Sequence, residues 1–106
     1  MQYRLRISRR AQQDIDVLAV YLREYGERFA AVQIDRLTQI LISHIGETPR
    51  TWGYFALTGA PYHAYLFRIG RRTQYWIVYL IDEEARAIDI VRVWNARRRS
   101  STFVVQ

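Results

Sequence analysis

The sequence contains no cysteine and no lysine, so all sixteen of its basic side chains other than histidine are arginine. Without cysteine the chain has no disulfide bond and no thiolate metal ligand, which fits a reducing compartment and leads us to expect a cytoplasmic protein. Without lysine there is no side-chain amine to act as a catalytic base or to form a Schiff base. Each arginine instead presents a planar fork that binds phosphate or carboxylate through paired hydrogen bonds. The cations therefore favour the binding of anions.

Long apolar runs are also missing. None approaches the ~20 residues of a membrane span, and the N-terminus alternates arginine with apolar residues, unlike a signal peptide. Proline and glycine are few, and no repeat, linker or low-complexity segment interrupts the chain. We therefore expect one domain over residues 1–106, without a membrane as partner.

Metal-binding side chains are scarce. The only histidines are His44 and His63, and neither belongs to a cluster of histidines and carboxylates with the spacing of a metal site. The sequence therefore predicts no metal and no cofactor.

The first half of the chain has the pattern of one strand followed by two helices. Apolar residues alternate strictly over residues 3–7, which indicates a half-buried strand. Ser8 is suited to cap a helix that runs to about Tyr25. Gly26 separates it from a second helix over residues 27–45. The short connection predicts an antiparallel helical hairpin.

The second half predicts strands over residues 62–69, 73–81 and 87–94, where β-branched and aromatic residues gather. Their connections are too short for parallel crossovers, so the strands should form an antiparallel meander. The middle strand is apolar at both odd and even positions, which places it in the centre of the sheet with both faces covered. We expect the helices to cover one face, and a partner chain or a shallow groove to account for the other.

These elements predict an α+β fold with the order β-α-α-β-β-β, in which a helical hairpin packs on one face of a curved antiparallel sheet. The aromatic loop over residues 52–61 should pack on the edge of the sheet, and the apolar residues 102–105 should dock on it. The apolar stripes of the helices should meet the last two strands. The residues concerned are Ile15, Leu18, Leu22, Ile34, Leu37, Leu41, Ile77, Tyr79, Ile88 and Ile90.

Positive charge is concentrated in the second half. Residues 1–61 hold eight arginines and six acids, whereas residues 62–106 hold eight arginines and four acids. In a meander, the turn at residues 70–72 and the end of the last strand lie at the same end of the sheet. The arginines there should converge into one patch that attracts an acidic protein surface or a phosphate backbone. The candidate target-binding residues are Arg71, Arg72, Arg97, Arg98 and Arg99.

A ribonuclease would need a group that activates the 2′-hydroxyl, a group that protonates the leaving oxygen, and cations around the phosphorane. Cations are plentiful, but the base is not obvious. If the chain is a nuclease, its candidate catalytic residues are Arg68, Tyr75, Tyr79 and Arg98. The two tyrosines suit the core of the sheet better than catalysis, so the residues alone leave the catalytic group unknown.

Several motifs resemble the RelE/ParE family of bacterial toxins. The segment Y-R-L-R-I-S-R-R-A-Q-Q-D-I-D-V-L-A-V-Y-L resembles the family's first strand, its Ser, its A-x-x-D-[IL] motif and its first helix. F-A-A-V-Q-I-D-R-L resembles the second helix, Q-Y-W-I-V-Y-L-I-D the Y-R-[IV]-x-Y strand, and I-V-R-V-W-N-A-R-R the last strand with H-x-x-R. The chain departs from this pattern at Trp76, where the family usually has Arg, and at Asn95, where it often has His.

The resemblance implies a toxin of a bacterial toxin–antitoxin pair. One branch of the family cuts messenger RNA on the ribosome, and another inhibits DNA gyrase without being a nuclease. The helix opening resembles the gyrase-directed, ParE-like branch, and the two departures weaken the nuclease alternative. The resemblance therefore favours a gyrase inhibitor of the plasmid-stabilisation type. The alternatives are a metal-independent, ribosome-dependent endoribonuclease and a non-catalytic RNA-binding module.

The resemblance also implies a partner. This partner is a cognate antitoxin whose acidic, amphipathic C-terminal segment wraps the toxin, in a heterotetramer or a larger assembly. Aromatic and arginine side chains on the sheet suit such a segment, through groove docking and bidentate carboxylate pairs. The candidate antitoxin-binding residues are Tyr65, Phe67, Trp76 and Trp94.

Overall fold

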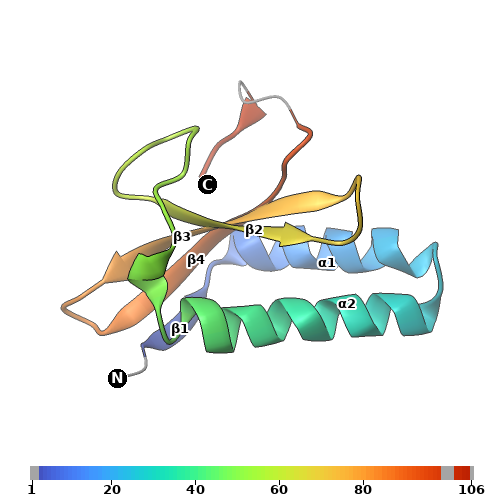
Figure 1. Ribbon diagram of the computed structural model, residues 1–106, viewed down its shortest axis with the longest axis horizontal. Coiled ribbons are helices and arrows are strands. Elements are labelled where there is room, and N and C mark those ends of the chain that lie inside the picture. Colours follow the sequence, from blue (N-terminus) through green and yellow to red (C-terminus); the bar gives the residue numbers. More distant parts are fainter. Residues whose placement is uncertain (1–2, 99–101, 106) are drawn as a thin grey trace.

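A computed structural model describes residues 3–98 and 102–105, which form a four-stranded sheet with a pair of helices across one face (Figure 1). The element order is the one that the sequence predicts. The elements are β1 (Arg4–Ile7), α1 (Arg9–Arg23), α2 (Glu27–Gln39), the π-helical turn η1 (Ile40–Ile45), the 3-10 turn η2 (Pro49–Thr51), β2 (His63–Arg68), β3 (Gln74–Asp82) and β4 (Ala87–Asn95).

The sheet is mixed, which corrects the prediction of a wholly antiparallel sheet. Its strand order is β1-β4-β3-β2. β2, β3 and β4 form the predicted antiparallel meander, but β1 pairs with β4 in parallel, with Arg4 opposite Ala87 and Ile7 opposite Ile90. β1 therefore runs parallel to β2, and the two helices form the long crossover that parallel strands require.

The hairpin begins and turns where the sequence indicates. The Ser8 side chain caps α1, because its Oγ accepts a hydrogen bond from the backbone N–H of Ala11 at 3.0 Å. Gly26 joins the helices with a φ of 120°, in a region that residues with a side chain rarely adopt. The predicted second helix reaches Ile45, but its last turns are π-helical rather than α-helical.

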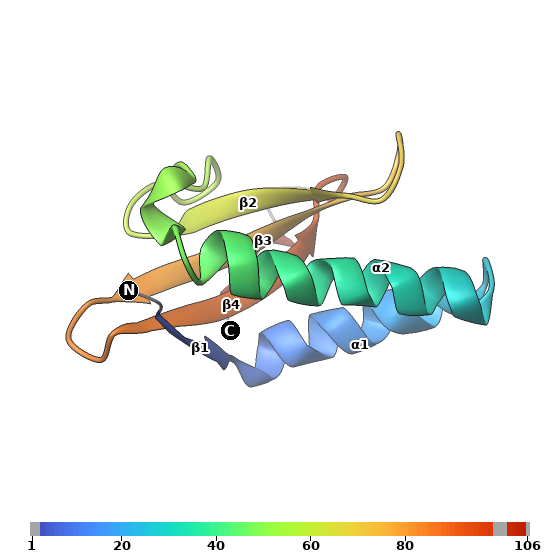
Figure 2. The same ribbon diagram turned by 60° about the horizontal axis from the view of Figure 1, so that its bottom comes forward.

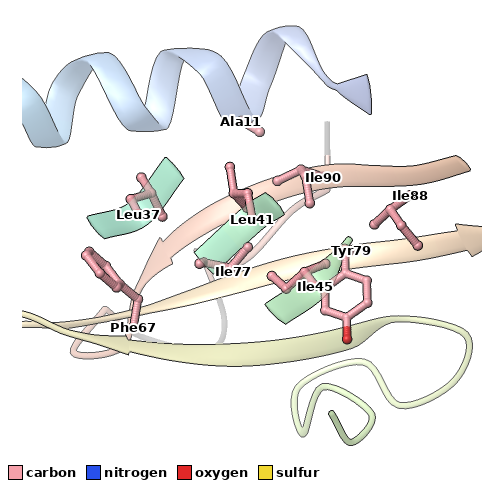
Figure 3. Packing of buried hydrophobic residues seen from close by; sticks show 9 residues of the cluster. All are labelled: Ala11, Leu37, Leu41, Ile45, Phe67, Ile77, Tyr79, Ile88 and Ile90. Atoms are coloured by element: carbon pink, nitrogen blue, oxygen red, sulfur yellow. The ribbon is translucent and has the colours of Figure 1, made fainter. Parts of the chain in front are cut away.

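The helices cover one face of the sheet, and the main core lies between the helices and the sheet (Figure 2). Leu37, Leu41 and Ile45 point from the second helical segment towards Ile77 and Tyr79 of β3 (Figure 3). This contact confirms the prediction for Leu37 and Leu41, and Ile15 packs against the same cluster. Leu18, Leu22 and Ile34 instead belong to a separate cluster with Ile69 and Tyr75, which corrects their predicted contact with Ile77, Tyr79, Ile88 and Ile90. The buried members of the cluster are Ala11, Leu37, Leu41, Ile45, Phe67, Ile77, Tyr79, Ile88 and Ile90.

The opposite face is covered by the chain itself, not by a partner chain or an open groove as one expectation had it. Phe55 of the loop and Phe103 of the C-terminal segment pack together there, with ring centroids 5.1 Å apart. Phe103 also packs edge-to-face on Trp94 at 4.9 Å. Figure 1 shows the loop and the C-terminal segment on one side of the sheet and the helices on the other. The predicted docking of the C-terminal segment is confirmed.

Arg6 fastens β1 to its neighbours. Its guanidinium binds Asp89 of β4 at 2.5 Å and Asp82 at the end of β3 at 3.0 Å. The backbone N–H of Ala85 and then Arg6 hold the pKa of Asp82 below its ordinary value of 3.8. The ionised form of Asp82 is therefore the one that the folded chain stabilises.

Replacing Leu37 with Ala tests the packing of the hairpin. Leu37 is 1% exposed in the main core, so Leu37→Ala should lower the free energy of unfolding by ~2–5 kcal/mol. Val32→Ala on the same helix is the control, because Val32 is 47% exposed and its truncation should change stability by less than about 0.5 kcal/mol. Urea denaturation measures both. Equal losses of stability in the two variants would show that the buried face of the second helix is assigned to the wrong residues.

Acid should weaken the attachment of β1. Because the folded pKa of Asp82 lies below 3.8, its contribution is complete above that pH and is lost as the pH falls through the folded pKa. The denaturation midpoint should therefore decrease from pH 5 to about pH 2, and Asp82→Asn should show a shallower decrease. Parallel acid titrations of the two proteins by circular dichroism give the comparison. Identical slopes would exclude Asp82 as a contributor.

Candidate functional site

The arginine-bearing segments lie at the same end of the sheet. Arg68 at the end of β2 pairs with Gln74 at the start of β3, and the Ala96 N–H donates to the Gln74 carbonyl at 2.9 Å. The 69–73 turn and the residues after β4 are therefore neighbours in the topology (Figure 1). The arginine end is defined here as the exposed residues Arg71, Arg72, Arg97 and Arg98. Arg99 lies outside the described residues.

The four residues proposed for a nuclease do not share one site. Tyr79 is fully buried, and its hydroxyl donates to the Pro49 carbonyl at 2.6 Å. Burial raises the pKa of Tyr79, so it is a structural residue of the core. Arg68 is exposed on β2, and its position in the strand places it on the face opposite to Tyr75. Of the four, Tyr75 and Arg98 line the same cleft.

This cleft, named here the β4 cleft, lies between α1 and the end of β4 and has a volume of about 430 Å³. Burial, and then the neighbouring Tyr21, raise the pKa of the Tyr75 hydroxyl. The raised pKa favours the protonated form of the Tyr75 hydroxyl. The lining residues are Arg10, Gln13, Asp14, Val17, Leu18, Tyr75, Arg92, Val93, Asn95 and Arg98.

A buried ion pair forms the floor of the β4 cleft. Arg92 is 1% exposed, and its Nε and Nη2 donate to the Asp14 carboxylate at 2.7 and 3.1 Å. The same carboxylate accepts the backbone N–H of Val93 at 2.9 Å. Arg92 also donates to the Val104 carbonyl. Arg92 is thus an internal link between α1, β4 and the C-terminal segment.

The proposed antitoxin-binding aromatics are divided between the two faces of the sheet. Leu66 of β2 lies opposite Trp76 of β3, so these two side chains share one face of the sheet. Tyr65 and Phe67, which flank Leu66, point to the other face, which the helices cover. Trp76 pairs with Trp94 on the face opposite to the helices. Phe67 and Trp94 are 0% and 2% exposed. The four residues therefore do not form one surface, and Phe67 and Trp94 belong to the core.

Several exposed apolar side chains, which the sequence analysis missed, lie on the helices. Tyr25 packs edge-to-face on Tyr21 and on Phe29, which links α1 to α2 across their connection. The spacing of Val17, Val20 and Tyr21 on one helix was the available signal. The hairpin strip is defined here as the exposed residues Val17, Val20, Tyr21, Tyr25, Phe29 and Val32.

Two findings concern metal-ligating side chains and helices that could cross a membrane. No group of three or more metal-ligating side chains gathers among residues 3–98 and 102–105. Within the same residues, no helix has the length and apolar character that a membrane crossing requires.

Comparison with known proteins gives a family and a fold. Residues 5–100 match the family described as "ParE toxin of type II toxin-antitoxin system, parDE". Comparison with curated proteins gives no match. The toxin–antitoxin complex RelBE2 from Mycobacterium tuberculosis contains a chain with a TM-score of 0.61 and 21% identity, over 92% of this chain and 95% of that chain. At this identity the likeness concerns the fold.

The ion pair under the cleft can be tested by removing one partner. Asp14→Ala leaves the Arg92 guanidinium buried without its carboxylate, and it should lower the free energy of unfolding by about 3 kcal/mol or more. Asp16→Ala is the control, because Asp16 lies two residues further along the same helix and is exposed. It should lower the free energy of unfolding by less than about 0.5 kcal/mol. Thermal denaturation compares them. A loss as small for Asp14 as for Asp16 would contradict the structural role of the pair.

Proposed function

We propose that this chain, which belongs to the ParE toxin family of type II toxin–antitoxin systems, acts in the cytoplasm by binding DNA gyrase, and not by cutting RNA. The family match spans residues 5–100 and makes the chain a toxin of this class. The choice of target rests on the residues at the end of the sheet.

The placement of Trp76 and Tyr79 is the observation that most favours gyrase over RNA as the target. Trp76 stands where the resemblance places the strand Arg of the family, and its ring packs edge-to-face on Phe55 at 5.8 Å. Tyr79 is held in the core by Pro49. A ribonuclease needs a base that accepts the proton of the 2′-hydroxyl. Tyr75 has a raised pKa, and Asp14 is paired with Arg92, so neither supplies one in the β4 cleft.

The arginine end is the proposed contact with gyrase. Its members are exposed, and none belongs to the ion pairs found among the described residues. Guanidinium groups that are exposed and outside such ion pairs can bind carboxylates of a partner through paired hydrogen bonds. They also raise the rate of encounter with an acidic surface. Arg99 is included in the proposal from its place in the sequence.

A cognate antitoxin with an acidic, amphipathic C-terminal segment is the second proposed partner. A solved structure with a similar fold, RelBE2, is a complex of a toxin with its antitoxin. The hairpin strip supports this proposal, because apolar side chains on neighbouring turns suit the apolar face of a partner segment. Tyr65 and Trp76 stay candidate contacts because they are half-exposed. A heterotetramer or larger assembly, and a role in plasmid stabilisation, belong to the same proposal.

Purified toxin should inhibit DNA supercoiling by gyrase and should leave ribosome-bound messenger RNA intact. The double variant Arg97→Ala/Arg98→Ala should raise the concentration for half-inhibition by about tenfold, which corresponds to ~1.4 kcal/mol of binding free energy. Arg4→Ala/Arg28→Ala is the matched control, because it removes the same charge from exposed positions outside the arginine end. The control should inhibit like the unchanged toxin.

Two results would contradict this proposal. Cleavage of ribosome-bound message by the toxin would establish the nuclease alternative. Equal loss of inhibition in both double variants would show that net charge, and not the arginine end, governs the encounter with gyrase.

A further inference from the structure

α1 carries a row of exposed side chains along one side. Val17 is 69% exposed and Tyr21 is 37% exposed, and Gln13 is exposed as well. Residues three or four positions apart lie on the same side of a helix, so these three side chains form one row. Gln13 and Val17 also line the β4 cleft. The row therefore follows the side of α1 that borders this cleft, and the exposed Val20 flanks it.

The row ends in opposite charges. Arg10 precedes Val17 by seven residues and Glu24, the C-cap of α1, follows it by seven, which is about two helical turns in each direction. Both side chains are exposed, and neither belongs to an ion pair found among the described residues. A helix favours anions at its N-terminus and cations at its C-terminus. The stability of α1 therefore does not explain why Arg10 and Glu24 stand where they do.

The row is symmetric about Val17. Gln13 and Tyr21 each lie four residues from Val17, and the two charges each lie seven residues from it. If a second copy of α1 packs antiparallel on this row, with the two-fold axis at Val17, Arg10 of each copy meets Glu24 of the other. The amide of Gln13 then lies beside the hydroxyl of Tyr21 of the second copy. Every such contact occurs twice in a two-fold pair, so the row is complementary to itself.

The charges of the row select this arrangement over others. In a parallel pair of helices, each arginine would face an arginine and each glutamate a glutamate. An acidic segment laid along the row would be attracted by Arg10 but repelled by Glu24. The chain has a formal net charge of +6, so two copies repel one another unless opposite charges meet at their contact. An antiparallel second copy is therefore the occupant that satisfies both ends of the row.

We propose that two copies of this chain pair through α1, antiparallel across Val17, with Arg10 of each copy bound to Glu24 of the other. This inference does not depend on the proposed target or on the antitoxin, because it rests on α1 alone. α1 has 15 residues and is therefore about 22 Å long. A contact between two such helices is at the small end of specific interfaces, so the dissociation constant should be on the order of 10–100 µM.

Pairing through α1 also restricts access to the β4 cleft. Arg10, Gln13 and Val17 line this cleft, and all three lie in the row that the second copy covers. The remaining members of the hairpin strip, Tyr25, Phe29 and Val32, lie outside the row, so the pairing leaves them to the antitoxin. Self-association of the toxin thus closes one recognition surface and keeps another open.

Charge reversal tests the pairing by sedimentation velocity of the purified toxin, over concentrations around the expected dissociation constant. Arg10→Glu and Glu24→Arg each place like charges at both contacts, so each should raise the dissociation constant by about tenfold. Both changes accord with the helix dipole, so both variants should stay folded. An equimolar mixture of the two variants should pair like the unchanged toxin, because opposite charges then meet at both contacts. A mixture that stays monomeric, or single variants that pair like the unchanged toxin, would overturn the proposal.

Val17 at the two-fold axis provides a second test. Val17→Asp brings two carboxylates together at the axis, so it should weaken the pairing by about tenfold or more. Val32→Asp is the matched control, because Val32 is exposed on α2 and lies outside the row. The control should pair like the unchanged toxin. Equal weakening in the two variants would place the interface elsewhere on the hairpin and contradict the proposed axis.

The same variants distinguish a second copy from another occupant. Unchanged toxin that remains monomeric well above the expected dissociation constant refutes the pairing. The product of the reading frame that adjoins the toxin gene is then added to each variant. A complex that Val17→Asp weakens and Val32→Asp does not would assign the row to the antitoxin and replace this inference.

Discussion

The buried ion pair between Arg92 and Asp14 is the interaction on which the arrangement of the molecule depends. Asp14 fixes α1 against β4 by accepting from both the Arg92 side chain and the Val93 backbone. Arg92 holds the C-terminal segment through the Val104 carbonyl and lies over the Trp94 ring at 5.0 Å. A guanidinium that is removed from water is tolerated only when such partners satisfy it. One pair thus joins the helix layer, the sheet and the cover of the second face.

This pair also determines the chemistry available at the end of the sheet. Because Asp14 is engaged with Arg92, the free charge of the β4 cleft is that of Arg10 and Arg98. Phe55 and Phe103 fill the face of the sheet opposite to the helices. Trp76 lies on this face, at the position where the family usually has an Arg. The molecule therefore offers cations and apolar surfaces for recognition. These properties are the basis for proposing a toxin that acts by binding.

Local patterns in the sequence predicted the elements but not all of their partners. The cap at Ser8, the turn at Gly26 and the meander depend on neighbouring residues, so they could be inferred correctly. The parallel pairing of β1 with β4 depends on a contact between residues far apart in the chain, and no local pattern records it. The C-terminal docking could be anticipated from its apolar residues. The loop was predicted to pack on the edge of the sheet, and the burial of Phe55 over the second face could not be read from the sequence.

The site was less predictable than the fold. The topology of a meander brought Arg71 and Arg98 to the same end, as expected from strand direction alone. The burial of Tyr79 and Phe67 could be predicted only if the register of the strands were known. The alternation of apolar and polar residues does not reveal the register when a strand is apolar on both faces. The cleft that Arg10 and Asn95 line could not be predicted, because it exists only where α1 packs beside the end of β4. Titration of the purified toxin into purified gyrase by calorimetry, at low and at high salt, tests the central claim most directly. The account predicts binding that weakens steeply with salt, whereas no binding to gyrase together with binding to ribosomes would contradict it.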